Sequence, residues 1–217
     1  MRDAQVGTLL NELFQGQPMI IAITALKGGV GKTTTAVHLA AFLQTLAPTL
    51  LIDADKNRSA LVWSKEDKLP FYVASQAGAP GLIKKFTHIV IDTQARPEPE
   101  ELEDLAAGSD MLILPTTPNH LDLDTTVKAV ELLRTLNANY RVLLTKVDSR
   151  TKNAKDAREF LEEAQLPLFK TEIPLLVAFQ RSPSRGVVVK DYPDRRAKTG
   201  WYRYQDVGKE ILSAVPQ

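Results

Sequence analysis

Short apolar runs alternate along the chain with longer segments whose apolar residues recur at helical spacing. The expected strands are 19–25, 49–52, 71–75, 88–93, 110–115, 141–148 and 166–173. The expected helices are 33–46, 59–65, 121–136, 153–164 and 201–215. Most of the strand runs lack apolar and polar alternation, which is typical of strands buried on both faces. The pattern predicts a doubly wound α/β fold, with a mostly parallel sheet and helices on both faces.

A glycine-rich turn joins the first strand to the first helix. It reads Leu26-Lys27-Gly28-Gly29-Val30-Gly31-Lys32-Thr33-Thr34-Thr35. Glycine at 28, 29 and 31 lets backbone N–H groups turn toward phosphate oxygens, which a Cβ would obstruct. Lys32 can reach the β and γ phosphates, and the Thr33 hydroxyl can ligate Mg²⁺ at the helix N-terminus. The expected nucleotide-binding residues here are Lys27, Gly28, Gly29, Val30, Gly31, Lys32, Thr33 and Thr34.

Carboxylates stand at the ends of two expected strands. The run 49–52 leads into Asp53 and Asp55, and the run 88–91 leads into Asp92. Ligands of doubly wound sheets gather at the carboxyl ends of the strands, so these side chains should face Mg²⁺ and the γ phosphate. An apolar run that ends in aspartate is also the Walker B signature. The alternative for the acidic pair is the N-cap of a helix.

The loop departs from the ordinary pattern G-x-x-x-x-G-K-[ST], because Leu26 replaces the first glycine and Lys27 adds a second lysine. It resembles the deviant Walker A box, K-G-G-x-G-K-T-T, of the ParA/MinD family of P-loop ATPases. The resemblance runs from Met19 to the last helix and is nearest to ParA-type partition proteins without an N-terminal DNA-binding domain. It implies that Lys27 reaches across a nucleotide-sandwiched dimer to the partner's phosphates. The alternative is an exposed loop lysine above a generic nucleotide site.

The same resemblance assigns roles to the acidic residues. Asp53 and Asp92, with Thr33, are the expected Mg²⁺ ligands. Asp55 is expected to orient the attacking water, so the catalytic set is Lys27, Lys32 and Asp55. The chain departs from the family's D-x-D-P-Q switch by having Lys56-Asn57 after Asp55.

The strand at 141–148 ends in Thr145-Lys146-Val147-Asp148. In GTPases of this broad class a T-K-x-D turn reads guanine through its aspartate. The ParA family also has a threonine or asparagine and a basic residue here, next to adenine. We favour ATP over GTP, with Thr145 and Lys146 at the nucleotide and Asp148 as a turn former.

Basic residues concentrate near the C-terminus. Lysine and arginine against aspartate and glutamate give 12 − 16 = −4 over residues 1–140 and 15 − 9 = +6 over residues 141–209. The cluster comprises Arg181, Arg185, Lys190, Arg195, Arg196, Lys198 and Arg203. Two copies of it on one face of a dimer suit nonspecific DNA, a role that this region has in ParA relatives. The alternative is a solvated loop face.

An amphipathic N-terminal extension, residues 1–17, is expected to precede a P-loop ATPase domain at 18–217. Its apolar residues are Val6, Leu9, Leu10, Leu13 and Phe14, spaced as on one face of a helix. We expect this face to pack on the core or on a dimer partner. Docking on a membrane or on another protein is the alternative.

The composition excludes several classes of protein. The chain has no cysteine, which rules out disulfides, cysteine-ligated zinc and iron–sulfur clusters. No secretory signal and no apolar run near 18 residues is present, so we expect a cytoplasmic protein, associated with the nucleoid when ATP is bound. The C-terminal residues lack the basic amphipathic tail of MinD-type members, so no membrane partner is expected.

The resemblance implies a slow, partner-stimulated ATPase that uses ATP and Mg²⁺. The expected partners are a second copy of the chain on ATP binding, nonspecific DNA, and a ParB-like or adaptor protein that stimulates hydrolysis. The expected role is the segregation of plasmid or chromosomal DNA. The alternatives are an ATPase that positions a protein cargo such as a carboxysome or chemoreceptor cluster, a metabolic enzyme of the dethiobiotin synthetase kind, and a membrane-cycling regulator like MinD.

Overall fold

The structure, a computed structural model, describes residues 19–214, so the expected N-terminal helix lies outside the described residues. Six parallel strands form one sheet in the order β3-β2-β4-β1-β5-β6. The strands are β1 Met19–Ala25, β2 Thr49–Ala54, β3 Tyr72–Ser75, β4 His88–Ala95, β5 Met111–Thr116 and β6 Tyr140–Leu144. The helices are α2 Lys32–Leu43, α3 Ser59–Trp63, α4 Pro99–Gly108, α5 His120–Thr135, α6 Asn153–Glu163, α7 Val177–Arg181 and α8 Ala197–Leu212. The predicted doubly wound parallel fold is confirmed.

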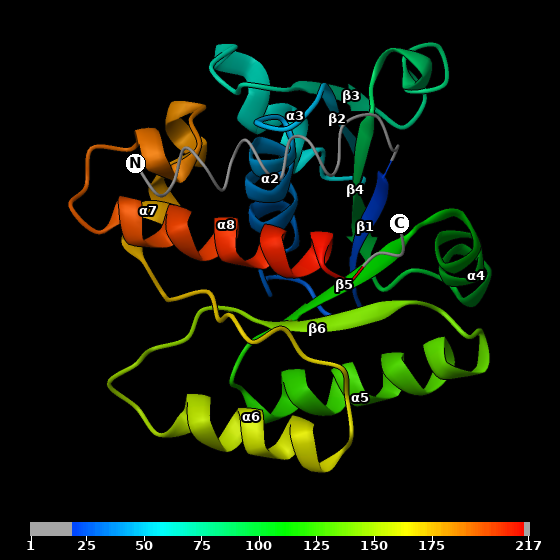
Figure 1. Ribbon diagram of the computed structural model, residues 1–217, viewed down its shortest axis with the longest axis vertical. Helices are drawn as coiled ribbons and strands as arrows, with labels where there is room; N and C mark the ends of the chain where they lie inside the picture. The colour runs from blue at the N-terminus through cyan, green and yellow to red at the C-terminus, as the bar shows by residue number, and fades with distance from the viewer. Residues whose placement is uncertain (1–18, 215–217) are drawn as a thin grey trace.

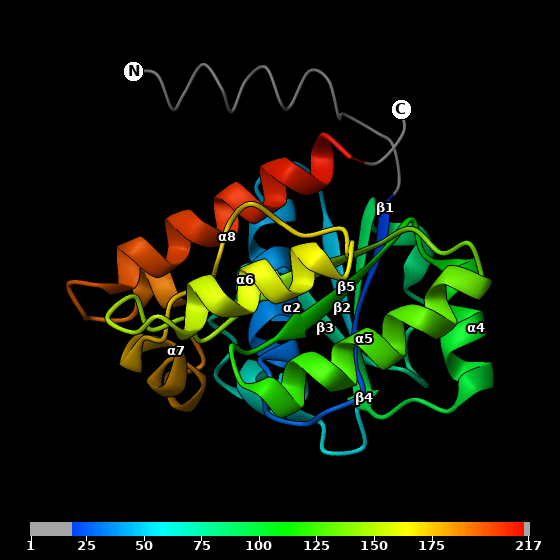
Figure 2. The ribbon, with the colours of Figure 1, turned by 90° about the horizontal axis from the view of Figure 1, so that it is seen from below.

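Helices cover both faces of the sheet. Ile21 and Ile23 of β1 belong to a buried cluster that includes residues of α2 and α8, whereas Ala22 belongs to a second cluster with residues of α4, α5 and α6. Figures 1 and 2 show α2 and α8 on one side of the strands and α4 on the other. Because each central strand is buried on both sides, an unbroken apolar run is what its environment requires. None of the helices formed by residues 19–214 is long and apolar enough to span a bilayer.

One predicted strand, 166–173, is wrong. The segment follows the edge of β6 and makes one isolated bridge to it, Val142 to Leu168, and a second bridge joins Val147 to Pro174 beyond both. The Val142 N–H donates to the Pro167 carbonyl at 2.8 Å, and the Phe169 N–H donates to the Val142 carbonyl at 3.0 Å. Proline has no N–H to donate, so Pro167 and Pro174 interrupt the ladder that a strand would need.

Helix α4 was not predicted, although its start has a recognisable signal. Pro99 occupies the first turn, and Glu98 and Glu101 form a reciprocal capping box with the backbone. The helix contributes only one fully buried residue, Leu102. An apolar period of that kind is too weak to identify a helix by spacing alone.

A buried histidine joins α2 to α8. His38 is fully buried, and its ring stacks on Tyr204 with centroids 4.8 Å apart. The Val189 N–H donates to Nε2 at 3.0 Å, so Nδ1 carries the proton that is donated to the Thr34 carbonyl at 2.6 Å. Burial lowers the pKa of His38 to about 4, and the bond to Thr34 acts in the opposite direction. The histidine is therefore neutral in the folded protein at neutral pH.

This burial makes stability depend on pH. The unfolded chain takes up a proton at His38 below a pH of about 6.5, whereas the folded chain resists until its pKa of about 4. We expect the free energy of unfolding to fall by about 2 kcal/mol from this group between pH 7.5 and pH 5. Urea denaturation at both pH values should show a smaller fall in His38→Gln than in the unaltered protein. The exposed His120, changed to Gln, is the control, and equal falls in all three proteins would contradict the assignment.

Candidate functional site

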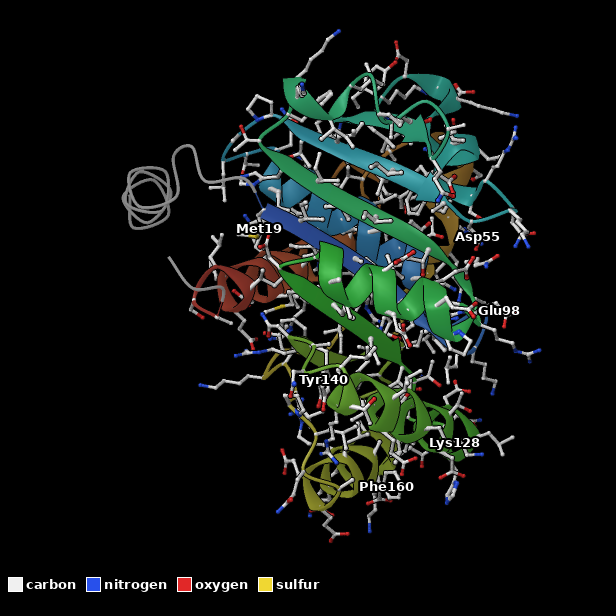
Figure 3. The ribbon with its side chains drawn as sticks, turned by 90° about the vertical axis from the view of Figure 1, so that its right-hand side faces the viewer. Met19, Asp55, Glu98, Lys128, Tyr140 and Phe160 are labelled. Atoms are coloured by element: carbon white, nitrogen blue, oxygen red, sulfur yellow. The ribbon has the colours of Figure 1, made fainter. Side chains whose placement is uncertain are left out.

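The carboxyl ends of β1, β2 and β4 bring the predicted acidic residues together. Asp53 of β2 and Asp92 of β4 are register partners on adjacent parallel strands, and Ile23 of β1 pairs with Asp92 on its other side. Figure 3 shows Asp55 at the end of the sheet opposite Met19, where β1 begins. The glycine-rich loop leaves β1 at this same end. The sheet therefore assembles the loop and three carboxylates from separate parts of the sequence.

A cavity of about 430 Å³ lies against the loop. Its lining includes Gly28, Gly29, Gly31, Lys32, Thr33, Thr34, Asp55, Ala95, Thr145 and Lys146. Gly29 and Gly31 have φ angles of 79° and 97°, which favour glycine. Gly28 has no positive φ, and a Cβ there would meet no atom within 4 Å, so no contact among the described residues requires a glycine at this position. The Gly31 carbonyl accepts the Thr35 N–H at 2.9 Å as α2 begins.

Asp92 is the most constrained charge of the site. It is fully buried, and neither carboxylate oxygen accepts a hydrogen bond from residues 19–214. Burial raises its pKa to about 7, while the nearby Thr33 hydroxyl and the Lys32 ammonium act to lower it. Burial also lowers the pKa of Lys32, against the opposing effect of Asp92 and Asp55. Burial is thus the main cause of both shifts, and the attraction between Asp92 and Lys32 opposes it.

The donor set fits a Mg²⁺ that is shared with a nucleotide. Asp92 offers two unpartnered carboxylate oxygens beside the Thr33 hydroxyl, and Mg²⁺ prefers such hard oxygen ligands. Within residues 19–214 no three side chains of His, Cys, Asp or Glu form a metal-binding cluster. A cation held here therefore needs phosphate and water oxygens to complete its shell, as Mg²⁺ does in nucleotide sites.

Asp53 and Asp55 are both engaged by backbone N–H groups. Asp53 accepts from Asp55 at 3.1 Å and from Leu61 in α3 at 2.8 Å, so it acts as a helix-start acceptor in this state. Asp55 accepts from the Asn57 N–H at 2.8 Å and remains in the cavity lining. The metal role of Asp53 and the water-orienting role of Asp55 stay predictions.

Thr145 and Lys146 form hydrogen bonds with the backbone of the glycine-rich loop. The Thr145 hydroxyl donates to the Val30 carbonyl at 2.7 Å, and the Lys146 ammonium donates to the Gly29 carbonyl at 2.5 Å. Both residues line the cavity, which agrees with their predicted place at the nucleotide. Their polar groups fix the loop backbone, a role that the sequence did not indicate.

Asp148 lies outside that lining. Its carboxylate forms a two-point ion pair with Arg150, at 2.8 and 2.6 Å, which with the Arg150 N–H holds the Asp148 pKa at about 2. The Thr151 N–H donates to the Asp148 carbonyl at 3.1 Å. The aspartate is thus committed to a local turn, which favours the turn-former interpretation over a guanine reader.

Lys27 points away from the cavity that its own loop encloses. Its ammonium is ion-paired with Asp122 of α5, which also accepts from the Thr117 hydroxyl. Lys27 is not among the residues that line the cavity. It lines an adjoining surface hollow with Asp122, which shares Gly28, Gly29, Lys146 and Leu175 with the cavity, and its side chain is 39% exposed. Sequence reasoning missed Asp122, because 95 positions separate it from Lys27.

The predicted DNA-binding residues all reach the surface. Arg181, Arg185, Lys190, Arg195, Arg196, Lys198 and Arg203 are exposed, and none forms a salt bridge with a residue in the described range. They lie on α7, α8 and the loop between them, which adjoin in Figures 1 and 2. Arg185 and Lys190 rest over the rings of Tyr192 and Trp201, each at 5.2 Å. Aromatic packing therefore fixes two of the seven charges.

Comparison with known families settles the class of protein. Residues 21–189 match the family described as CobQ/CobB/MinD/ParA nucleotide binding domain. The chain belongs to this family. The ParA and MinD members of this family are ATPases, and the matched residues include the glycine-rich loop that borders the cavity.

Relatives within the family include positioning and partition proteins. The maintenance of carboxysome distribution protein A of Gloeobacter kilaueensis is 32% identical over 204 residues, which cover 89% of this chain and 94% of that protein. An ATP complex of a McdA variant from Cyanothece superposes with a TM-score of 0.74 at 16% identity, over 93% of this chain and 98% of that one. A putative plasmid partition protein from Borrelia burgdorferi bound to AMPPNP gives 0.72 at 20% identity, over 91% and 99%. The two solved structures support the fold.

The hydrogen bond from Thr145 to the loop backbone can be tested directly. Thr145→Val keeps the side-chain shape but removes the donor to the Val30 carbonyl. The loss of this hydrogen bond should destabilise the observed loop conformation by about 1 kcal/mol. We expect ATP affinity, measured by isothermal titration calorimetry, to weaken about fivefold. Thr135→Val is the control, because that hydroxyl also donates to a backbone carbonyl but is exposed at the end of α5. Unchanged ATP affinity in Thr145→Val would show that this hydrogen bond does not stabilise the loop for nucleotide binding.

Proposed function

We propose that the chain is a ParA-type ATPase that positions a cargo by cycling on and off nonspecific DNA. The observation that carries the proposal is the direction of Lys27. A lysine that served its own nucleotide would line the loop's cavity, whereas Lys27 lies beyond it and pairs with Asp122 at the surface. That position supports a role in which Lys27 leaves Asp122 and reaches the phosphates of a second copy.

Within one protomer, each polar residue of the site has a defined task. Lys32 and the N–H groups of residues 28–34 bind the phosphates, and Asp55 orients water toward the γ phosphorus. Thr33 and Asp92 would hold Mg²⁺, which neutralises phosphate charge when bound. Thr145 and Lys146 keep the loop in the shape that this binding needs. Hydrolysis removes the γ phosphate that joins the protomers, so the dimer separates.

The dimer is the state that binds DNA. The seven exposed basic residues of one protomer form a modest patch, and pairing two protomers doubles it. Binding of this kind neutralises phosphates without reading bases, so it is independent of sequence and falls steeply with salt. ATP thus controls location: the dimer associates with the nucleoid, and the monomer is released.

The cargo is carried by a second protein. A ParB-like or adaptor protein would bind the ATP-bound dimer and stimulate hydrolysis, which draws its cargo along the DNA. A plasmid or chromosome segment is one such cargo. A protein compartment is the second candidate, and the 32% identity with a carboxysome distribution protein over 89% of this chain favours it.

Fluorescence anisotropy of a labelled random-sequence duplex tests the proposal. We expect binding with ATP and none with ADP, GTP or no nucleotide. Lys32→Ala should abolish binding because it removes the phosphate contact, whereas Asp55→Ala should retain it because only hydrolysis is blocked. DNA binding that is the same with and without nucleotide would contradict the proposed cycle of binding and release. So would the absence of DNA binding while ATP still dimerises the protein.

A matched pair of variants locates the DNA surface. Replacing Arg195 and Arg196 with Gln removes four charges from the dimer, and we expect affinity to fall about tenfold or more at 0.1 M salt. Replacing Lys84 and Lys85 with Gln removes as many charges from an exposed turn elsewhere and should leave affinity nearly unchanged. Equal losses would show that net charge alone governs binding.

A further inference from the structure

A second hollow, of about 340 Å³, lies on the sheet face opposite α2. Ile52 of β2 and Ile91 of β4 contribute to it from the sheet, Leu105 from α4, and Ile83 from the turn that precedes β4. Figure 3 shows this face, with α4 in front of the strands and α2 behind them. We call this hollow the α4 groove.

The α4 groove is an apolar surface that the described chain leaves open. On this face α4, α5 and α6 pack over β1, β5 and β6, whereas a smaller cluster around Leu50 and Ile52 lies under the segment 76–86. Ile83 is 41% exposed at the edge of the groove. An apolar hollow of this size, bordered by polar residues, is typical of a binding surface.

The α4 side of the groove is acidic. Glu101 and Asp104 line it, and Glu98, Glu100 and Glu103 stand beside them in the sequence without lining it. All are exposed, and none is ion-paired with a residue that the structure describes. Capping and the helix dipole account for the acids of the first turn of α4, up to Glu101. They do not account for Glu103 and Asp104, because the dipole effect fades after that turn, and Asp104 lines the groove.

We propose that the α4 groove docks a segment of a protein partner in which an apolar side chain is flanked by lysine or arginine residues. The apolar side chain would fill the hollow over Ile52 and Ile91, and the basic residues would meet the acidic rim. This division of roles, an apolar anchor for affinity and charges for steering and register, is common at protein interfaces. A nucleic acid is a poor occupant, because the rim repels phosphate.

The α4 groove and the nucleotide cavity share one strand end. Thr93 and Gln94 line the groove, and the next residue, Ala95, lines the nucleotide cavity. Gln94 is also tied to Glu101 of α4 at 2.7 Å. A segment seated in the groove therefore contacts residues next to the γ-phosphate site without entering it. The docking proposal goes beyond the proposed function and depends on neither dimerisation nor DNA binding.

Selection of random peptides displayed on phage against the purified full chain tests the proposal. We expect enriched peptides to contain lysine or arginine around a large apolar residue. A labelled synthetic copy of the top peptide should bind at least about tenfold more weakly to Ile83→Ser, which removes the exposed apolar edge. Val62→Ser is the matched control, since Val62 is similarly exposed on α3 and lies outside the groove.

The charged rim has its own pair of variants. Replacing Asp104, which lines the groove, with Asn should weaken peptide binding about threefold at low salt, whereas replacing the exposed Glu163 of α6 with Gln should not. Failure to enrich any peptide, enrichment without basic residues, or equal binding by the groove and control variants would overturn the proposal. The peptide assay tests only the docking proposal, and the DNA anisotropy assay tests only the proposed function. Failure of one can therefore be distinguished from failure of the other.

Discussion

The burial of Asp92 is the constraint on which the site depends. A carboxylate with no hydrogen bond inside a parallel sheet is costly, and its pKa of about 7 expresses that cost. Lys32 and the Thr33 hydroxyl offset part of it in the nucleotide-free chain. In the proposed function a Mg²⁺ with its phosphates would offset more of the cost. The residue that lowers stability is then also the one that would hold the metal, as is common at buried charges with a chemical task.

The loop that receives the phosphates depends on a strand far from it in sequence. Thr145 and Lys146 follow β6, yet they fix the carbonyls of Val30 and Gly29. Glycine, which lacks a Cβ, gives positions 29 and 31 access to many backbone conformations, and these two bonds stabilise the one with positive φ angles. Lys27 of the same loop is ion-paired with Asp122, a pair that it would have to leave in the proposed dimer.

The sequence predicts much of this arrangement, because buried strands and the phosphate loop have local signals. The strands at 19–25 and 49–52 and the order of the acidic strand ends follow from apolar runs alone. Prediction fails where partners are distant or signals are mixed. The run 166–173 is apolar enough for a strand. Pro167 within it and Pro174 directly after it interrupt the hydrogen-bond ladder that a strand would need. Asp122 could not be connected to Lys27, because only the folded chain brings these distant residues together. The contact of Asp53 with the start of α3 is nearer to the helix-cap alternative that the sequence also offered.

The central claim is that Lys27 acts on the nucleotide of the other protomer, and mixing two inactive variants tests it most directly. Lys27→Ala retains Asp55 but gives its partner no lysine, whereas Asp55→Ala retains Lys27 but cannot orient water. In a mixed dimer the Lys27→Ala protomer receives the lysine from its partner, so one complete site forms. We predict that the mixture hydrolyses ATP faster than either variant alone at the same total concentration. A rate no greater than the average of the two would place Lys27 in its own site and contradict the account.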